Sequence, residues 1–221
     1  MLMQLNAIEI RVIGCLIEKE VTTPDYYPMT LNGLVNACNQ KSNRDPVVSL
    51  DEKSVLRALD SLRDKKLALM ISSAGGRVPK YEHKFTEMYA FLPEDVAVLC
   101  VLMLRGPQTA GEIRGRTGRL YKFETLEEVE SVLARLMARE PDPMVMKLPR
   151  QAGRKESRTM HLFAGEPVID EDEVQPAVES ARLELQAEDE RIATLEAEVL
   201  FLREQMEAVK QELAAFRKQF E

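Results

Sequence analysis

The side chains best suited to recognition or chemistry are concentrated in residues 36–50, NACNQKSNRDPVVSL. Asparagines recur there at helical spacing, opposite an apolar stripe that includes Cys38, which is therefore assigned to packing. Asparagine side chains can pair with adenine or donate to phosphates, and they can equally cap and fold the turn that follows. We predict a solvent-facing edge of a helix-turn-helix with these candidate nucleic-acid-binding residues: Asn36, Asn39, Lys41, Asn43 and Arg44.

Further positive charges fall on the predicted helices and hairpins. The remaining candidate nucleic-acid-binding residues are Lys53, Arg57, Arg77, Lys80, Arg114, Arg116, Arg119, Arg150, Arg154, Lys155 and Arg158. A hairpin tip with several basic residues can follow a phosphate backbone or enter a minor groove, but a solvated turn has the same composition. In contrast, Glu127, Glu128 and Glu130 open a later helix and would repel phosphates. The same acids favour the dipole at the start of that helix.

Neither a metal site nor a catalytic centre is indicated. The cysteines, Cys15, Cys38 and Cys100, lie far apart in apolar helical patterns, which is typical of buried free thiols. His83 and His161 have no nearby cysteine and no nucleophile or carboxylate at a fixed spacing. The P-loop, GxGxxG, GxSxG and HExxH motifs are absent from the sequence. We therefore predict a protein that is not an enzyme and has no cofactor or metal, with both histidines in structural positions on strands.

The elements that position these residues repeat after about 77 residues. The apolar periodicity predicts three helices and two strands in each repeat. In the first repeat these are residues 5–18, 30–40, 51–65, 67–72 and 78–85. In the second they are residues 93–105, 110–117, 126–139, 144–148 and 158–163. Three helices followed by a β-hairpin is the order of a winged helix, so we predict two tandem winged-helix domains, 1–86 and 87–164.

Local motifs support this alignment of the two repeats. Ser49 and Thr125 each begin a capping box ahead of a third helix, and Thr109 begins another ahead of a second helix. The hairpins end alike, as Lys-x-x-His-x-Phe at 80–85 and Arg-x-x-His-x-Phe at 158–163. Val47 and Val48 are the expected short first strand. The predicted fold class is mostly α with small β-hairpins, an α+β arrangement.

Residues 165–176 form a predicted acidic linker, and a seven-residue apolar repeat follows over 177–221. This repeat predicts a coiled-coil helix and a homodimer, with mild support for parallel strands from the charged flanking positions. The alternative is a helix that packs on its own body. The candidate dimerisation residues are Leu185, Ile192, Leu195, Val199, Leu202, Met206, Val209, Leu213 and Phe216.

Charge is distributed unevenly along the 221 residues, whose net charge is −7. Residues 1–86 carry 12 basic and 10 acidic side chains, residues 87–164 carry 12 and 11, and residues 165–221 carry 6 and 16. The body is thus slightly basic, which leaves a nucleic-acid partner open. No apolar run approaches the length of a membrane span, and the N-terminus lacks the basic start of a signal peptide. We expect a cytoplasmic protein without a membrane partner.

The Asn-rich stretch VTTPDYYPMTLNGLVNACNQKSNRDPV at 21–47 closely resembles the YceH family of uncharacterised bacterial proteins. Supporting matches are RVIGCLIEKEVTTP at 11–24, GGRVPKYEHKF at 75–85, QTAGEIR at 108–114 and GRKESRTMHLFAG at 153–165. The resemblance covers residues 1 to about 165 and implies tandem winged helices. It implies no activity and no functional residues.

Two hypotheses for function follow from these patterns. The first is a dimeric, regulatory protein that binds double-stranded DNA through the first domain and both hairpins. The second is a scaffold that uses its winged helices to bind partner proteins, which the acidic helix near residue 128 and the nearly neutral body favour.

Overall fold

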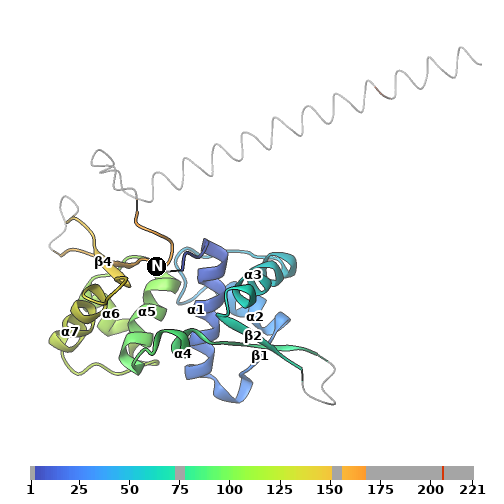
Figure 1. The fold of residues 1–221 in the computed structure, drawn as a ribbon, viewed down its shortest axis with the longest axis horizontal. Coiled ribbons are helices and arrows are strands. Elements are labelled where there is room, and N and C mark those ends of the chain that lie inside the picture. Colours follow the sequence, from blue (N-terminus) through green and yellow to red (C-terminus); the bar gives the residue numbers. More distant parts are fainter. Residues whose placement is uncertain (1–2, 73–77, 151–155, 168–205, 207–221) are drawn as a thin grey trace, which may run out of the picture. The chain divides into compact units, whose positions relative to one another are not determined.

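The computed structural model describes residues 3–72, 78–150, 156–167 and 206 (Figure 1). The chain divides into two units, Met1–Ile169 and Asp170–Glu221. The first unit mixes helices with two small antiparallel sheets, as expected for an α+β protein. In the second unit the structure describes Met206, which is helical and exposed, so the predicted coiled coil and its other dimerisation residues lie outside the described residues. Among the described helices, none has both the length and the apolar character that a membrane span requires.

The first half of unit one, residues 3–86, begins with a helix and ends with a hairpin. Its elements are α1 (Ala7–Thr22), η1 (Pro24–Tyr26), β1 (Met29–Thr30), α2 (Leu31–Cys38), α3 (Glu52–Asp64), β2 (Ala68–Ile71) and β3 (Lys80–His83). Asn6 starts α1 in a capping box with Glu9, and Thr30 caps α2 by accepting from the N–H of Gly33. The three helices and the two hairpin strands predicted for this half are present, with ends shifted by a few residues.

The first sheet has the strand order β1-β3-β2, and both pairs are antiparallel. Its first strand differs from the prediction, because Met29–Thr30 pairs with β3 and Val47-Val48 is not a strand. Val47 is instead exposed in the turn after α2. A segment of two residues has too few alternating positions to be distinguished from a loop by its sequence pattern.

The second half, residues 87–167, follows a short connecting helix and repeats the same order. The elements are α4 (Phe85–Tyr89), α5 (Pro93–Arg105), α6 (Ala110–Thr117), α7 (Leu126–Met137), β4 (Val145–Lys147) and β5 (Thr159–His161). Helices α5 and α6 have the predicted bounds, whereas α4 was not predicted. Gln108, just before α6, forms an isolated β-bridge with Thr159. In the first half the equivalent position, just before α2, is occupied by β1.

The predicted capping boxes have three different outcomes. The box at Thr109 is confirmed in full. Thr125 accepts from the N–H of Glu128, but the Glu128 carboxylate accepts from the N–H of residue 124 rather than from that of the cap. The box at Ser49 is wrong, because Asp51 is the residue that caps α3. The Asp51 backbone is extended and its carboxylate accepts from the N–H three residues on, which is the geometry of an N-cap.

Both halves contribute to one hydrophobic core. The first helix of each half, α1 and α5, pack against each other (Figure 1). A Cβ on Gly14 of α1 would lie 2.9 Å from Leu104 Cδ2 of α5, so a side chain there would have to displace Leu104. Phe85 and Phe163, the matching phenylalanines of the two repeats, are fully buried and meet edge to face with ring centres 5.1 Å apart.

Candidate nucleic-acid interface

The turn between α2 and α3 is closed by two of the candidate asparagines. Asn39 Oδ1 accepts from the Leu50 N–H at 2.7 Å, and Asn39 Nδ2 donates to the Leu50 carbonyl at 2.8 Å. Asn43 has φ 59°, a left-handed conformation that asparagine tolerates, and its Oδ1 accepts from Arg105 at 2.5 Å. These side chains therefore fold the turn and connect it to the second half.

Arg44 lies in the interior, so the prediction that it faces solvent is wrong. Its guanidinium donates to both carboxylate oxygens of Glu18, at 3.1 and 2.6 Å, and to the Ala37 carbonyl at 3.2 Å. Burial alone would lower the pKa of Arg44, but the Glu18 carboxylate and Cys15 raise it overall. Arg44 is thus a charged support for the start of the turn, and its side chain is withdrawn from any external partner.

Glu18, the ion-pair partner of Arg44, was missed by the sequence analysis. Burial acts to raise its pKa, but the neighbouring Arg44 lowers it, with a smaller contribution from Lys19. Glu18 lies 26 residues before Arg44 in the chain, so no local pattern links the two. One feature of the sequence could have indicated this pair. Glu18 lies three residues after Cys15, on the apolar stripe of α1, and a carboxylate at such a position requires a cation nearby in the interior.

Two members of the Asn-rich stretch remain exposed. Asn36 donates to Asn32 Oδ1 at 3.4 Å on the surface of α2. Lys41 is exposed in the turn and has no hydrogen bond or ion pair with another described residue. These two side chains, unlike Arg44, are free to meet a partner.

Helix α3 has a mixed outer face. It buries Val55, Ala58, Leu59 and Leu62, which leaves Lys53 and Arg57 exposed near its N-terminal end. Arg57 has no hydrogen bond or ion pair with another described residue. Further along the same helix, Asp60 pairs with Arg63 at 3.0 Å. The unpaired positive charge of α3 is therefore concentrated at the end that follows the turn.

The hairpins carry fewer described cations than predicted. In the first hairpin Lys80 is exposed at the start of β3, and Arg77 lies outside the described residues. In the second, Arg150 is exposed after β4, and Arg154 and Lys155 lie outside the described residues. Arg158 is half-buried and paired, donating to Glu112 at 3.1 Å and to the Pro107 carbonyl at 2.7 Å.

Helix α6 and the turn after it present three exposed arginines, Arg114, Arg116 and Arg119. Arg114 donates to the Glu124 carbonyl at 2.6 Å. On the next helix, the acidic positions 127, 128 and 130 are exposed, as the sequence analysis expected. In the second half the free positive charge therefore belongs to α6 and its following turn rather than to α7.

The two histidines hold matching positions at the ends of β3 and β5 and are both buried, as predicted. His83 Nε2 lies 2.9 Å from Glu20 Oε2, and its backbone N–H donates to the Tyr27 hydroxyl. Among the described residues His161 has no charged partner, and burial lowers its pKa to about 4. Both side chains are therefore parts of the core.

Cys15, Cys38 and Cys100 are buried free thiols, which confirms the prediction. Within the described residues, no group of three or more histidine, cysteine, aspartate or glutamate side chains is arranged to hold a metal ion.

Comparison with known proteins places the chain in a family. The model described as "Protein of unknown function, DUF480" matches residues 5–154. The chain belongs to the DUF480 family. A "UPF0502 protein" of Geotalea uraniireducens is 57% identical over 219 residues, which cover 99% of each chain. Another from Opitutus terrae is 55% identical over 172 residues, 78% of this chain and 75% of that protein. DUF480 thus spans most of unit one, including α3, the Asn-rich turn and α6.

Proposed function

We propose that the protein is a non-enzymatic, dimeric DNA-binding protein, with each half of unit one a winged helix. The helix order, the strand that precedes α2 and the hairpin that follows α3 support this assignment for the first half. The order α5, α6, α7, hairpin supports it for the second half. The resemblance to the YceH family, which implies tandem winged helices, agrees with it.

The observation that carries the proposal is the exposed N-terminal end of α3 beside the Asn-rich turn. Lys41, Lys53 and Arg57 are all exposed there, and Arg57 and Lys41 have no internal partner among the described residues. In a winged helix this end of the third helix enters the major groove, where cations meet phosphates or guanine edges. The second half contributes phosphate contacts through α6 rather than through the acidic start of α7.

Dimerisation through residues 177–221 is part of the proposal. A homodimer would present two copies of α3, and the DNA site would repeat with the same symmetry. Binding of this kind to specific sites fits a regulatory role inside the cell.

Fluorescence anisotropy with labelled duplex DNA tests this function. We expect binding at about 50 mM salt. The logarithm of the association constant should fall linearly with the logarithm of the salt concentration. The variant Arg57→Gln should weaken binding and reduce the salt slope by about one, since one phosphate contact is lost. Arg63→Gln, an exposed change at the far end of α3 whose charge is already paired with Asp60, is the matched control and should bind as the wild type does. Absence of binding at low salt, or of any salt dependence, would contradict the proposal.

A second function, a scaffold for protein partners, is favoured by β2. This strand lies at the edge of its sheet, and its residues Leu69, Met70 and Ile71 are 45, 43 and 37% exposed. Exposed apolar edge strands are surfaces on which another chain can add a strand. If this is the function, Met70→Lys should abolish recovery of protein partners in a pull-down and leave DNA binding unchanged. Recovery of nucleic acid alone by the wild type would count against it.

A further inference from the structure

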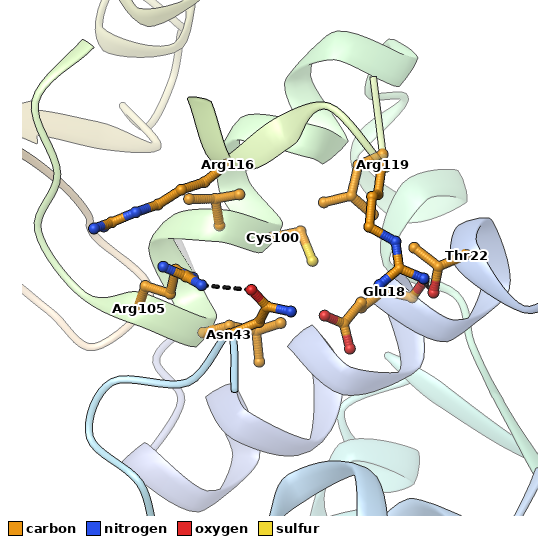
Figure 2. A pocket seen from close by; sticks show the side chains of 10 residues that line it. Glu18, Thr22, Asn43, Cys100, Arg105, Arg116 and Arg119 are labelled. Atoms are coloured by element: carbon orange, nitrogen blue, oxygen red, sulfur yellow. Dashed lines mark hydrogen bonds between the residues drawn. The ribbon is translucent and has the colours of Figure 1, made fainter. Parts of the chain in front are cut away.

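A small cavity with polar and apolar walls lies between the two halves of unit one. Its volume is about 50 Å³, and its walls come from α1, the turn at Asn43, α5, the end of α6 and the turn after α6. Arg105 lies on one side of it and Arg119 on the other, with Cys100 and Glu18 between them, whereas the guanidinium of Arg116 points away from it (Figure 2). The cavity lies beside helix α6, to which DNA phosphate contacts are assigned above, and the sequence analysis did not predict it.

Arg105 and Arg119 keep hydrogen-bonding capacity for a ligand in the cavity. Arg119 has no hydrogen bond or ion pair with another described residue. Arg116 is directed away from the cavity and forms a long ion pair with Glu112, at 3.9 Å (Figure 2). Arg105 donates to an uncharged acceptor, the amide oxygen of Asn43. Each guanidinium has five N–H donors, so most of these donors are unused.

The cavity also keeps a surplus of positive charge. Its own acid, Glu18, is held at 2.6 Å by Arg44 and at 3.3 Å by Lys19, so its charge is already compensated. Burial, and then the positive charges of Arg116 and Arg44, lower the pKa of Arg105, whereas Asp45 and Glu18 act to raise it. Arg105 is therefore a cation in a site where positive charge exceeds negative, and an anion there would relieve the repulsion.

We infer that this cavity binds a phosphate group, held by Arg105 and Arg119. The fork of a guanidinium matches two phosphate oxygens, so arginines on opposite walls can hold one group between them. The Asn43 amide, whose oxygen is engaged by Arg105, has its Nδ2 donors available on the same wall. A site of this volume encloses a single phosphate, and the exposed Arg119 borders a mouth through which an ester extends to solvent.

The position of the site gives binding a structural consequence. Asn43 belongs to the first half, whereas Arg105 and Arg119 belong to the second. A bound phosphate would therefore join the turn at the proposed DNA-binding face to α5 and the turn after α6. Since it binds the folded chain and not the unfolded one, it would raise the thermal stability of the whole unit.

Isothermal titration and thermal unfolding of the full chain with inorganic phosphate test the inference, against chloride at matched ionic strength. We expect phosphate to raise the melting temperature by a few degrees where chloride does not. Arg105→Gln and Arg119→Gln should each weaken the phosphate affinity about tenfold, the loss of a charged hydrogen bond. Arg114→Gln, an exposed change on α6 but outside the cavity, is the matched control and should leave the affinity unchanged.

Competition with duplex DNA then identifies the source of the phosphate. If the cavity takes a phosphate of the DNA backbone, inorganic phosphate competes with DNA and Arg119→Gln weakens both. If it takes a small phosphate ester, phosphate binds equally well to the protein–DNA complex. No stabilisation beyond that of chloride, or equal phosphate affinities in the Arg119→Gln and Arg114→Gln proteins, would overturn the inference. Because phosphate is titrated without DNA, this failure is distinct from a failure to bind DNA.

Discussion

Arg44 is charged in the interior, and its value to the protein depends on Glu18. The side chain of Arg44 is fully covered and that of Glu18 is 13% exposed, so neither charge is well solvated. Removing one partner from such a pair leaves an uncompensated charge, which is far more costly than the loss of a surface pair. At this scale sequence patterns predicted types of residue well and their partners poorly. Lys41 and Arg44 look alike in sequence, and the distant Glu18 decides which of them is buried.

We expect Arg44→Met to lower the free energy of unfolding by about 3 kcal/mol, because Glu18 loses the closer of its two described cations and keeps Lys19 at 3.3 Å. The control is Arg63→Ala on α3, which removes an exposed pair and should cost about 0.5 kcal/mol or less. Urea unfolding at pH 7 measures both. The double change Arg44→Met with Glu18→Leu should cost less than the single Arg44→Met, and equal costs would contradict this account.

His161 makes stability dependent on pH. Its pKa is about 4 in the folded protein and about 6.5 when unfolded, so the unfolded chain binds more protons between these values. The free energy of unfolding is therefore highest above pH 6.5 and falls by about 3 kcal/mol as the pH decreases to 4.

The variant His161→Gln isolates this contribution, because glutamine does not titrate. Chemical unfolding of both proteins between pH 7 and pH 4 should show a stability difference that narrows, or changes sign, as the pH falls. Parallel pH curves for the two proteins would contradict the assignment to His161.

At the scale of elements, the order of helices and hairpins was predictable because each depends on a local apolar period. The bounds of α5 and α6 were predicted correctly, since Pro93 and Thr109 are unambiguous start signals. The first strand was not predicted correctly, because the two residues Met29–Thr30 are too few to show an apolar alternation. Their pairing with Tyr81 is also remote in sequence. The N-cap of α3 was predicted at Ser49 but is Asp51, because serine and aspartate are both favoured at N-cap positions.

The close approach of α1 and α5 makes Gly14 intolerant of a side chain. We expect Gly14→Val to lower the free energy of unfolding by about 1–3 kcal/mol through overpacking against Leu104 and Met103. Gly111→Ala on α6 is the control, because the nearest atom to its new Cβ is 3.9 Å away and alanine favours a helix. This control should raise the melting temperature slightly. A neutral Gly14→Val would show that the two helices can separate at no cost.

At the scale of the whole molecule, the sequence repeat correctly indicated recurring elements, and the packing between the repeats could not be read from it. Contacts such as that of Phe85 with Phe163 join residues that no short motif relates. The function proposed for the molecule depends on surfaces formed in this way, including the cavity that Asn43 shares with α5 and the turn after α6.

Deleting residues 177–221 should convert the proposed dimer to a monomer or a weaker dimer, because the heptad repeat supplies the interface. Sedimentation of the full and shortened chains measures the mass directly. The shortened protein should keep its far-ultraviolet signal per residue for unit one, which shows that folding is retained. An unchanged mass would refute a dimer made by this segment.

The contact between the repeats joins like with like. Phe85 meets Phe163, and α1 meets α5, so each half offers the corresponding element to the other. Contacts between equivalent surfaces are those of a symmetric homodimer. The two halves of unit one thus pack against each other as two copies of a single repeat would in such a dimer.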